Sequence, residues 1–308
     1  MFLNIGKGKE GVNYSNYILT LGVIIAAFSI LGYAPLYITM YLKGIDFNQV
    51  TDMNVVSDAL GLNVFLTLIL VPYIVILITL LFCVRYMHKA PYLSVFTIRK
   101  AFDWNRFWFS FLMWGSVLSL FLAISYLSGS PILLNFDATT FFMLLLISIF
   151  ILPLQTTCEE VLFRGYLFQG LGLFFKKGWL SVLITGVLFG LMHGANPEVD
   201  KIGEILLVFY ILNGVFLGVV ALMDDGLELT MGYHAVNNIF AALIVTNEWQ
   251  SFQTDALFLD KTPPGFGVEN VLTLLIIQPL LLYVFAKKYK WTNWKKRFFE
   301  TQNFKIEE

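Results

Sequence analysis

Residues 139–175 read TTFFMLLLISIFILPLQTTCEEVLFRGYLFQGLGLFF, and this stretch decides what kind of protein the chain is. The run is apolar almost throughout, yet it contains the adjacent glutamates Glu159 and Glu160, followed by Arg164. Charged side chains at bilayer depth are costly, so they persist mainly where they face a protein interior and serve a function. The stretch therefore predicts a membrane helix that carries buried acid–base chemistry, which suggests an enzyme.

The composition of the whole chain also indicates a membrane protein. Hydrophobic residues make up 58% of the 308 residues and charged residues 13%, against about 45–50% and about 25% in ordinary globular domains. A soluble chain of this length has too little interior to bury so much apolar surface, so lipid must cover part of it. Cys83 and Cys158 lie in apolar segments and imply no disulfide framework. We expect the lipid bilayer as a partner and no nucleic acid.

Apolar stretches of about 20 residues, enough to cross a hydrocarbon core, occur eight times. We therefore predict an all-α fold, a polytopic membrane helical bundle with about eight transmembrane helices. The approximate ranges are 17–42, 61–84, 107–127, 145–173, 179–198, 203–223, 227–246 and 269–286. The fourth range belongs to the run 139–175, which is too long for one upright span. Either that span tilts steeply, or its first part is an interfacial or bent segment that ends near Pro153.

The basic residues predict the orientation of this bundle. With eight spans, 16 of the 20 Lys and Arg residues fall on the side of the two termini, and three fall on the other side. The positive-inside rule then places both termini in the cytoplasm. We expect an integral protein of the bacterial cytoplasmic membrane, in which 287–308 is a basic cytoplasmic tail. The 16 are Lys7, Lys9, Arg85, Lys89, Arg99, Lys100, Arg106, Lys176, Lys177, Lys287, Lys288, Lys290, Lys295, Lys296, Arg297 and Lys305; the three are Lys43, Lys201 and Lys261.

Several polar residues near predicted span ends carry weaker signals. His88 adjoins Lys89 at the end of a span, and we expect it to be a satisfied core histidine rather than a ligand. Four acidic residues are expected to be solvated loop charges: Glu204, Asp224, Asp225 and Glu228.

The two adjacent glutamates should have different surroundings. Glu160 and Arg164 are spaced i, i+4, which places them on one helix face within ion-pairing reach. Glu159 is rotated by about 100° from Glu160 and has Phe163, not a basic residue, at i+4. We therefore expect Glu160 to be held ionised by Arg164, and Glu159 to be the candidate general base. A single Glu–Arg pair of this kind is also common as a purely structural contact.

A short hairpin should bring a histidine to the depth of Glu159. Residues 176–178 join the fourth and fifth spans; Glu159 lies 16 residues before Phe175, and His193 lies 15 residues after Gly178. These separations correspond to about 24 and about 22 Å along helix axes. Antiparallel packing of the two spans therefore predicts that Glu159 and His193 lie in one layer.

A second histidine falls in the seventh predicted span. His234 and Asn238 are spaced i, i+4, so imidazole and amide share one helix face. Three glycines surround His193 in sequence and should let helices approach closely: Gly186, Gly190 and Gly194. Together these residues predict that polar groups from three helices converge at one level of the bundle.

This set of motifs resembles the CPBP family of intramembrane proteases, which includes the CAAX-prenyl endopeptidase and the bacterial Abi-type proteins. The family motifs Glu-Glu-x-x-x-Arg, Phe-x-x-x-His and His-x-x-x-Asn occur in family order. They are Glu159-Glu160-Val161-Leu162-Phe163-Arg164, Phe189-Gly190-Leu191-Met192-His193 and His234-Ala235-Val236-Asn237-Asn238. The resemblance covers roughly 139–247, which we take as the catalytic core of a single membrane domain, 1–308.

The resemblance implies an endopeptidase that hydrolyses peptide bonds of a membrane-associated peptide or protein by means of water. Its site would lie in a membrane-embedded cavity open toward the cytoplasm. Glu159, helped by His193, would deprotonate the water. Glu160 and Arg164 would hold the geometry and charge of the site.

The resemblance assigns the second histidine motif to transition-state stabilisation. His234 and Asn238 would donate hydrogen bonds to the developing oxyanion, a role worth about 3–4 kcal/mol per donor in other enzymes. A zinc-dependent variant remains open, with Glu159, His193 and His234 as the ligands. We favour the metal-free scheme because amides are poor zinc ligands and an arginine beside the carboxylates opposes a cation.

Two functions outside catalysis compete with this prediction. The chain could be a non-proteolytic immunity or scaffold protein that keeps the motifs for packing. It could also be a secondary transporter that uses Glu159 and Glu160 for proton coupling, although the repeated halves typical of transporters are not visible in the sequence.

Overall fold

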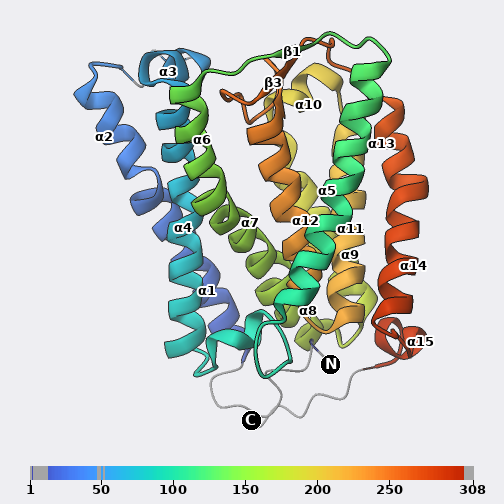
Figure 1. Ribbon diagram of the computed structural model, residues 1–308. Helices are drawn as coiled ribbons and strands as arrows, with labels where there is room; N and C mark the ends of the chain where they lie inside the picture. The colour runs from blue at the N-terminus through green and yellow to red at the C-terminus, as the bar shows by residue number, and fades with distance from the viewer. Residues whose placement is uncertain (1, 3–12, 47–49, 51–52, 302–308) are drawn as a thin grey trace.

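The computed structural model describes residues 2, 13–46, 50 and 53–301, which fold almost entirely into helices (Figure 1). Lys7, Lys9 and Lys305, which were counted in the predicted topology, lie outside the described residues. Within the described part, seven helices are long and apolar enough to cross a membrane: Tyr14–Leu42, Leu62–Tyr86, Trp104–Leu127, Ala138–Phe175, Gly178–Ala195, Ile205–Asp224 and Val268–Lys288. The predicted all-α membrane bundle is confirmed.

The first and the last crossing lie on opposite sides of the bundle (Figure 1). The first crossing comprises α1 (Tyr14–Ala27), the π-helix η2 (Phe28–Gly32) and α2 (Ala34–Leu42). After the short helix α3 (Met53–Leu60), α4 (Leu62–Tyr86) forms the second crossing. The 3₁₀ turn η4 (Tyr92–Val95) then leads to α5 (Trp104–Leu127), the third crossing. The last crossing comprises α13 (Val268–Leu272), the π-helix η8 (Thr273–Ile277) and α14 (Gln278–Lys288), and α15 (Trp294–Phe298) follows it. α4 packs against α7, and α5 packs against α12, so both contribute walls to the interior.

The fourth crossing is bent, which decides between the two alternatives left by the sequence. It consists of α6 (Ala138–Phe150), α7 (Leu152–Glu160), the π-helix η5 (Val161–Leu167) and α8 (Phe168–Phe175). A straight helix of these 38 residues would measure about 57 Å, against a hydrocarbon core of about 30 Å. The chain instead changes direction at Ile151, and Pro153 is the second residue of α7, which starts directly after it. Proline is accepted there because the first turn of a helix needs no donor from it.

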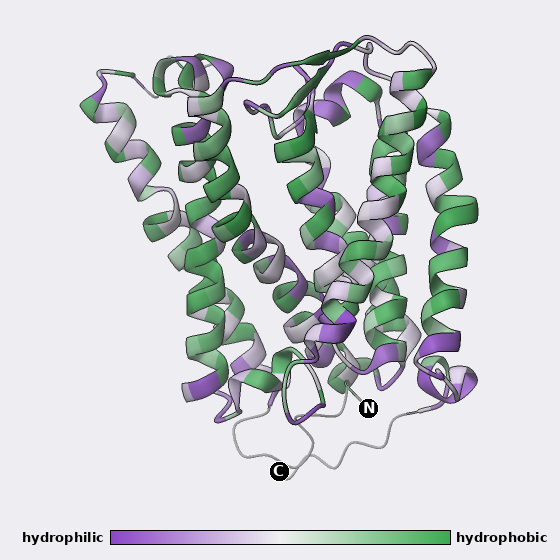
Figure 2. Cartoon of the chain, viewed as in Figure 1, coloured by the Kyte–Doolittle hydropathy of each residue, from purple (hydrophilic) through white to green (hydrophobic). Residues whose placement is uncertain are grey.

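The seventh predicted span, 227–246, is a shorter interior helix. It forms α12 (Glu228–Ile239) and the π-helix η7 (Phe240–Ile244), and it is not among the helices long and apolar enough to cross a membrane. Nearly every residue of α12 is buried. Figure 2 shows that hydrophilic residues gather at the two ends of the bundle and along α7 and α12 within it. The chain still passes from one end of the bundle to the other in this segment, between Glu228 and β2 (Val245–Thr246), but it does so as a polar helix surrounded by protein, which supplies the partners that lipid cannot.

The close crossing of α9 (Gly178–Met192) and α11 (Ile205–Asp224) depends on glycine. A Cβ on Gly190 would lie 2.7 Å from the backbone N of Ile211, and one on Gly186 would lie 2.8 Å from that of Val215. The predicted role of these two glycines is confirmed. A Cβ on Gly194 would meet only an ordinary contact at 3.7 Å, so the prediction was wrong for that residue.

Buried ion pairs close one end of the bundle, which carries the start of α1 and helix α15 and is called the terminus end below (Figure 1). Arg99 lies 3.0 Å from carboxylate oxygens of both Asp224 and Glu228, and Arg106 also pairs with Asp224. Both carboxylates are buried. The expectation of solvated loop charges was therefore wrong for Asp224 and Glu228, because arginines from another segment fold over them.

The sequence analysis also made predictions for three further residues, Asp225, Glu204 and His88. Asp225 forms an ion pair with Arg297 of α15, 2.7 Å apart, so it is not a free loop charge. Glu204, at the opposite end, is exposed as expected. His88 is a buried core residue, as predicted, and its Nε2 lies 2.8 Å from the hydroxyl of Tyr166.

The opposite end of the bundle, called the loop end below, carries α3, α10 (Pro197–Ile202) and a small sheet (Figure 1). The sheet has the order β1-β3-β2, in which β1 (Ile132–Leu134) pairs antiparallel and β2 (Val245–Thr246) pairs parallel with β3 (Phe258–Asp260). These strands were not predicted, because two or three residues are too few for an alternating pattern to register.

Candidate active site

His234 of α12 lies between the two adjacent glutamates of α7. Its Nδ1 is 2.8 Å from Oε1 of Glu160, and its Nε2 is 3.5 Å from Oε2 of Glu159. The same Oε1 of Glu160 accepts a hydrogen bond from Nη1 of Arg164 at 2.9 Å. Glu160 and Arg164 are fully buried, as the i, i+4 spacing predicted for an internal pair. The motif on α7 and the motif on α12 therefore meet in one cluster.

Arg164 is held by three different elements. It lies in the π-helix η5, a form that often occurs at functional sites. Its Nη2 donates to the carbonyl of Gly214 on α11 at 3.4 Å, and its guanidinium carbon lies 3.9 Å from the ring centre of Phe189 on α9. This geometry explains the phenylalanine of the second motif, whose ring covers the arginine.

Glu159 has one satisfied and one unsatisfied oxygen. Oε1 accepts a hydrogen bond from Nε2 of Gln155 at 2.7 Å, and Oε1 of Gln155 accepts one from Asn238 at 2.9 Å. Oε2 of Glu159 is buried and accepts no hydrogen bond from the described residues, and its neighbour is Nε2 of His234 at 3.5 Å. The sequence analysis missed Gln155, although its position four residues before Glu159 was a usable signal. Glu159 thus offers a buried acceptor whose other oxygen is fixed.

His193 reaches the same cavity through a different arrangement. It lies in the 3₁₀ turn η6 (His193–Ala195), and its Nδ1 donates to the carbonyl of Phe189 at 2.8 Å. Since a carbonyl only accepts, Nδ1 carries the proton, and in the neutral ring Nε2 is the acceptor. The ring stacks on Tyr210 with centres 4.4 Å apart. The structure records no direct bond between the described residues Glu159 and His193, but both line one cavity.

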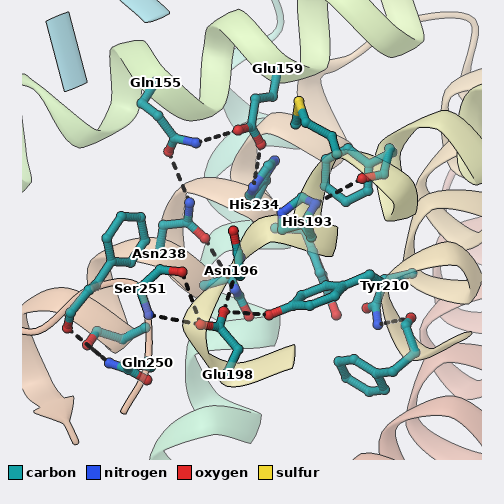
Figure 3. Close-up of a pocket in the computed structure, with 18 of the residues that line it drawn as sticks. Gln155, Glu159, His193, Asn196, Glu198, Tyr210, His234, Asn238, Gln250 and Ser251 are labelled. Atoms are coloured by element: carbon teal, nitrogen blue, oxygen red, sulfur yellow. Dashed lines mark hydrogen bonds and ion pairs between the residues drawn. The ribbon is translucent and has the colours of Figure 1, made fainter. Parts of the chain in front are cut away.

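The cavity has a volume of about 510 Å³ and is walled by α4, α5, α7, α9, α11 and α12. Glu159, His193, His234 and Asn238 of the predicted set line it, whereas Glu160 and Arg164 lie behind the wall. Figure 3 shows the lining side chains pointing toward one another from these helices. The predicted convergence of acidic, imidazole and amide groups is therefore observed.

A buried carboxylate of the loop end also lines the cavity and was missed by the sequence analysis. Oε1 of Glu198 accepts from Nδ2 of Asn196 at 3.0 Å and from the hydroxyl of Tyr210 at 2.8 Å. Its Oε2 accepts from the backbone N and from Oγ of Ser251, both at 2.9 Å. One carboxylate thus ties α10, α11 and the 247–257 loop together (Figure 3). No motif marks Glu198, because its partners come from three separate segments.

The predicted zinc ligands do not form a ready metal site. Among the described residues, no group of three or more His, Cys, Asp or Glu side chains is arranged to hold a metal ion. Glu159 and His234 adjoin, but His193 is turned toward Phe189 and Tyr210. We derive no chemical step through a metal.

Comparison with known proteins agrees with the motifs. Residues 138–240 match the model of the Rce1-like family, described as type II CAAX prenyl endopeptidase Rce1-like. The predicted resemblance to this group of intramembrane proteases is confirmed over residues 138–240, where the chain is similar to that family.

One curated relative and the solved structures complete the comparison. The chain is 30% identical over 167 residues to a protein of Bacillus subtilis (strain 168) named uncharacterized protein YyaK. The alignment covers 54% of this chain, and it spans 56% of the length of that relative. No solved structure matches the chain.

Proposed function

We propose that this protein is an intramembrane endopeptidase that hydrolyses peptide bonds of membrane-associated peptides or proteins. The observation that carries the proposal is Oε2 of Glu159, a buried carboxylate oxygen that accepts no hydrogen bond from the described residues and lies at the wall of a cavity lined by two histidines and several amides. The Rce1-like match of residues 138–240 supports the same reaction class.

In this mechanism Glu159 acts as the general base. A water molecule donates a hydrogen bond to its Oε2 and to Nε2 of His193, and its oxygen attacks the carbonyl carbon of the substrate. The proton passes to Glu159, and the carbonyl oxygen becomes an oxyanion. Transfer of this proton to the amide nitrogen then breaks the C–N bond and releases the amine. Gln155 supports this role because it fixes the other carboxylate oxygen.

The oxyanion is stabilised by His234 and Asn238 in this scheme. Nδ1 of His234 is occupied by Glu160, so its second ring nitrogen, Nε2, is the one that can serve as a donor beside Glu159 and the cavity. Asn238 donates one proton to Gln155 and keeps a second for the substrate.

We further propose that hydrolysis needs no metal ion and that the protein resides in a bacterial cytoplasmic membrane. The first point is testable with purified protein in detergent, in which prolonged chelation should leave peptide cleavage unchanged. Loss of cleavage on chelation, restored by zinc, would instead establish the zinc-dependent variant.

The test of the reaction class compares the peptides of membranes from cells that express the wild-type protein or the Glu159→Gln variant. The amide has nearly the same shape and keeps the bond from Gln155, but it is no base. Mass spectrometry should therefore find cleavage products that disappear in this variant. Glu204→Gln, at an exposed site, is the matched control and should keep them. An unchanged peptide pattern in Glu159→Gln would remove the proposal and favour a scaffold or immunity role.

A further inference from the structure

The cavity opens toward the loop end of the bundle. Six polar lining residues come from α10 and the residue before it, from the 247–257 loop and from the start of α13: Asn196, Glu198, Gln250, Ser251, Glu269 and Asn270. Of these, Glu269 is exposed, and Asn196, Gln250, Ser251 and Asn270 are partly exposed. Figure 1 shows α10 and the strands at this end, opposite α15. Solvent therefore reaches the cavity from the loop end.

The opposite direction is closed. The innermost lining includes Trp114, whose ring stacks on Tyr233 with centres 4.6 Å apart. Below this layer, Leu227 and Leu229 are fully buried, and the Arg99–Glu228 pair follows. None of the described residues that line the cavity comes from the terminus end.

The depth of the site agrees with this direction. Helix α9 starts at Gly178 at the terminus end, and His193 lies 15 residues further along the chain. That separation corresponds to about 22 Å of helix, which is beyond the middle of a core of about 30 Å. The reactive groups therefore lie closer to the loop end than to the terminus end.

The basic residues assign the two ends to the two sides of the membrane. Thirteen described Lys and Arg residues lie at the terminus end and three at the loop end. The thirteen are Arg85, Lys89, Arg99, Lys100, Arg106, Lys176, Lys177, Lys287, Lys288, Lys290, Lys295, Lys296 and Arg297; the three are Lys43, Lys201 and Lys261. The positive-inside rule places the richer end in the cytoplasm. The two expectations of cytoplasmic termini and a cavity open toward the cytoplasm are thus incompatible in this fold.

We propose that the cavity takes its substrate from the extracytoplasmic side of the membrane. Its substrate class is then peptide segments exposed on that side, such as exported peptides or the outward-facing flanks of membrane proteins. A lipid-modified C-terminus held at the cytoplasmic leaflet does not reach the cavity without crossing the bilayer. The substrate class rests on the proposed endopeptidase activity, whereas the direction of access does not.

Cysteine labelling in intact cells tests the direction of access without any activity measurement. The native thiols Cys83 and Cys158 are each 1% exposed and should stay silent to a membrane-impermeant maleimide. Thr262→Cys and Lys201→Cys, exposed at the loop end, should label in intact cells. Lys100→Cys and Lys295→Cys, exposed at the terminus end, should label only after permeabilisation. The reverse pattern overturns the proposal and leaves the proposed reaction untouched.

Labelling inside the cavity tests whether its mouth faces outward. Asn270→Cys lies in the cavity lining and should react with the impermeant maleimide in intact cells. The attached group should also suppress the peptide products that depend on Glu159. Protection of Asn270→Cys in intact cells, followed by labelling after permeabilisation, overturns the proposal. Outward labelling with no Glu159-dependent products preserves the direction of access and removes the endopeptidase.

Discussion

The Nδ1 atom of His234 lies 2.8 Å from Oε1 of Glu160, and this contact joins the first and last motifs of the chain. Because Arg164 donates to the same oxygen, Glu160 is a shared acceptor for two donors from different helices. Glu160 therefore orients the groups that face the cavity although it does not line the cavity itself. Its neighbour Glu159 is left to face the cavity.

Replacing Glu160 should damage stability as well as activity. Glu160→Gln leaves the guanidinium of Arg164 buried without its counter-charge, and breaking a buried pair in this way costs about 3–5 kcal/mol. Denaturant unfolding in detergent should show a loss of this size, whereas Glu159→Gln should unfold near wild type. The double variant Glu160→Gln/Arg164→Gln should lose less than the sum of the single variants. Strictly additive losses would mean that the two side chains do not interact.

Gln155 should prove to be a positioning residue for Glu159. Gln155→Leu removes the bond to Oε1 of Glu159 and the bond from Asn238. A hydrogen bond to a charged group is worth about 1.5–3 kcal/mol, so kcat should fall by about tenfold or more, with a smaller change in KM. Gln169→Leu is the matched control, since Gln169 is buried but bonds only to the carbonyl of Ser94. A similar loss of kcat in both variants would argue for a general packing defect.

The sequence predicts most of the fold because the signals are local. Long apolar runs specify membrane helices, and the i, i+4 spacing of Glu160 and Arg164 specifies a pair that the structure contains. The seventh predicted segment also runs through the bundle, as α12, but its burial by the surrounding helices could not be predicted, because apolar content does not report it. The bend at Ile151 was one of two alternatives that the sequence left open, and Pro153 marks its position.

Four residues of the cavity wall were named from the sequence, but their contacts were not. The motifs identify the residues on α7, α9 and α12, yet the proximity of His234 to both glutamates follows from how α12 enters the bundle. Glu198 was not predicted, because the groups that donate hydrogen bonds to it lie next to α10, on α11 and in a distant loop. Contacts between segments far apart in the chain leave no periodic trace in a single sequence.

The crossing of α9 and α11 gives a stability prediction. Gly190→Ala adds a methyl group 2.7 Å from the backbone N of Ile211, so the helices must separate, and overpacking typically costs about 1–3 kcal/mol. Arg164 should also lose its bond to Gly214, which lies on the displaced helix. Thermal unfolding in detergent should show a lower midpoint for Gly190→Ala. Gly194→Ala, where the new methyl meets only ordinary contact, should remain close to wild type.

His88 predicts a pH dependence of stability. Burial lowers the pKa of His88 from 6.5 to about 4. Between these two pH values the histidine is protonated in the unfolded chain but neutral in the folded protein. The contribution of neutral His88 is complete above about pH 6.5 and is lost as the pH falls toward 4. Denaturation midpoints measured from pH 7.5 to 4.5 should fall more steeply for wild type than for His88→Gln. Parallel curves would contradict the assignment.

Glu198→Gln should loosen the wall of the cavity without unfolding the protein. The four donors form two pairs: Asn196 with Tyr210, and the backbone N with the hydroxyl of Ser251. A glutamine has one side-chain oxygen, which can accept from only one of these pairs. Its amide N–H₂, which is itself a donor, then faces the other pair. His193 should lose order because it stacks on Tyr210. We expect kcat/KM to fall by about tenfold, with the larger change in KM because the lining contacts the substrate. Glu198→Asp should recover part of the loss, and Glu204→Gln should show none. A Glu198→Gln enzyme with wild-type KM and kcat would mean that the loop is held by its other contacts alone.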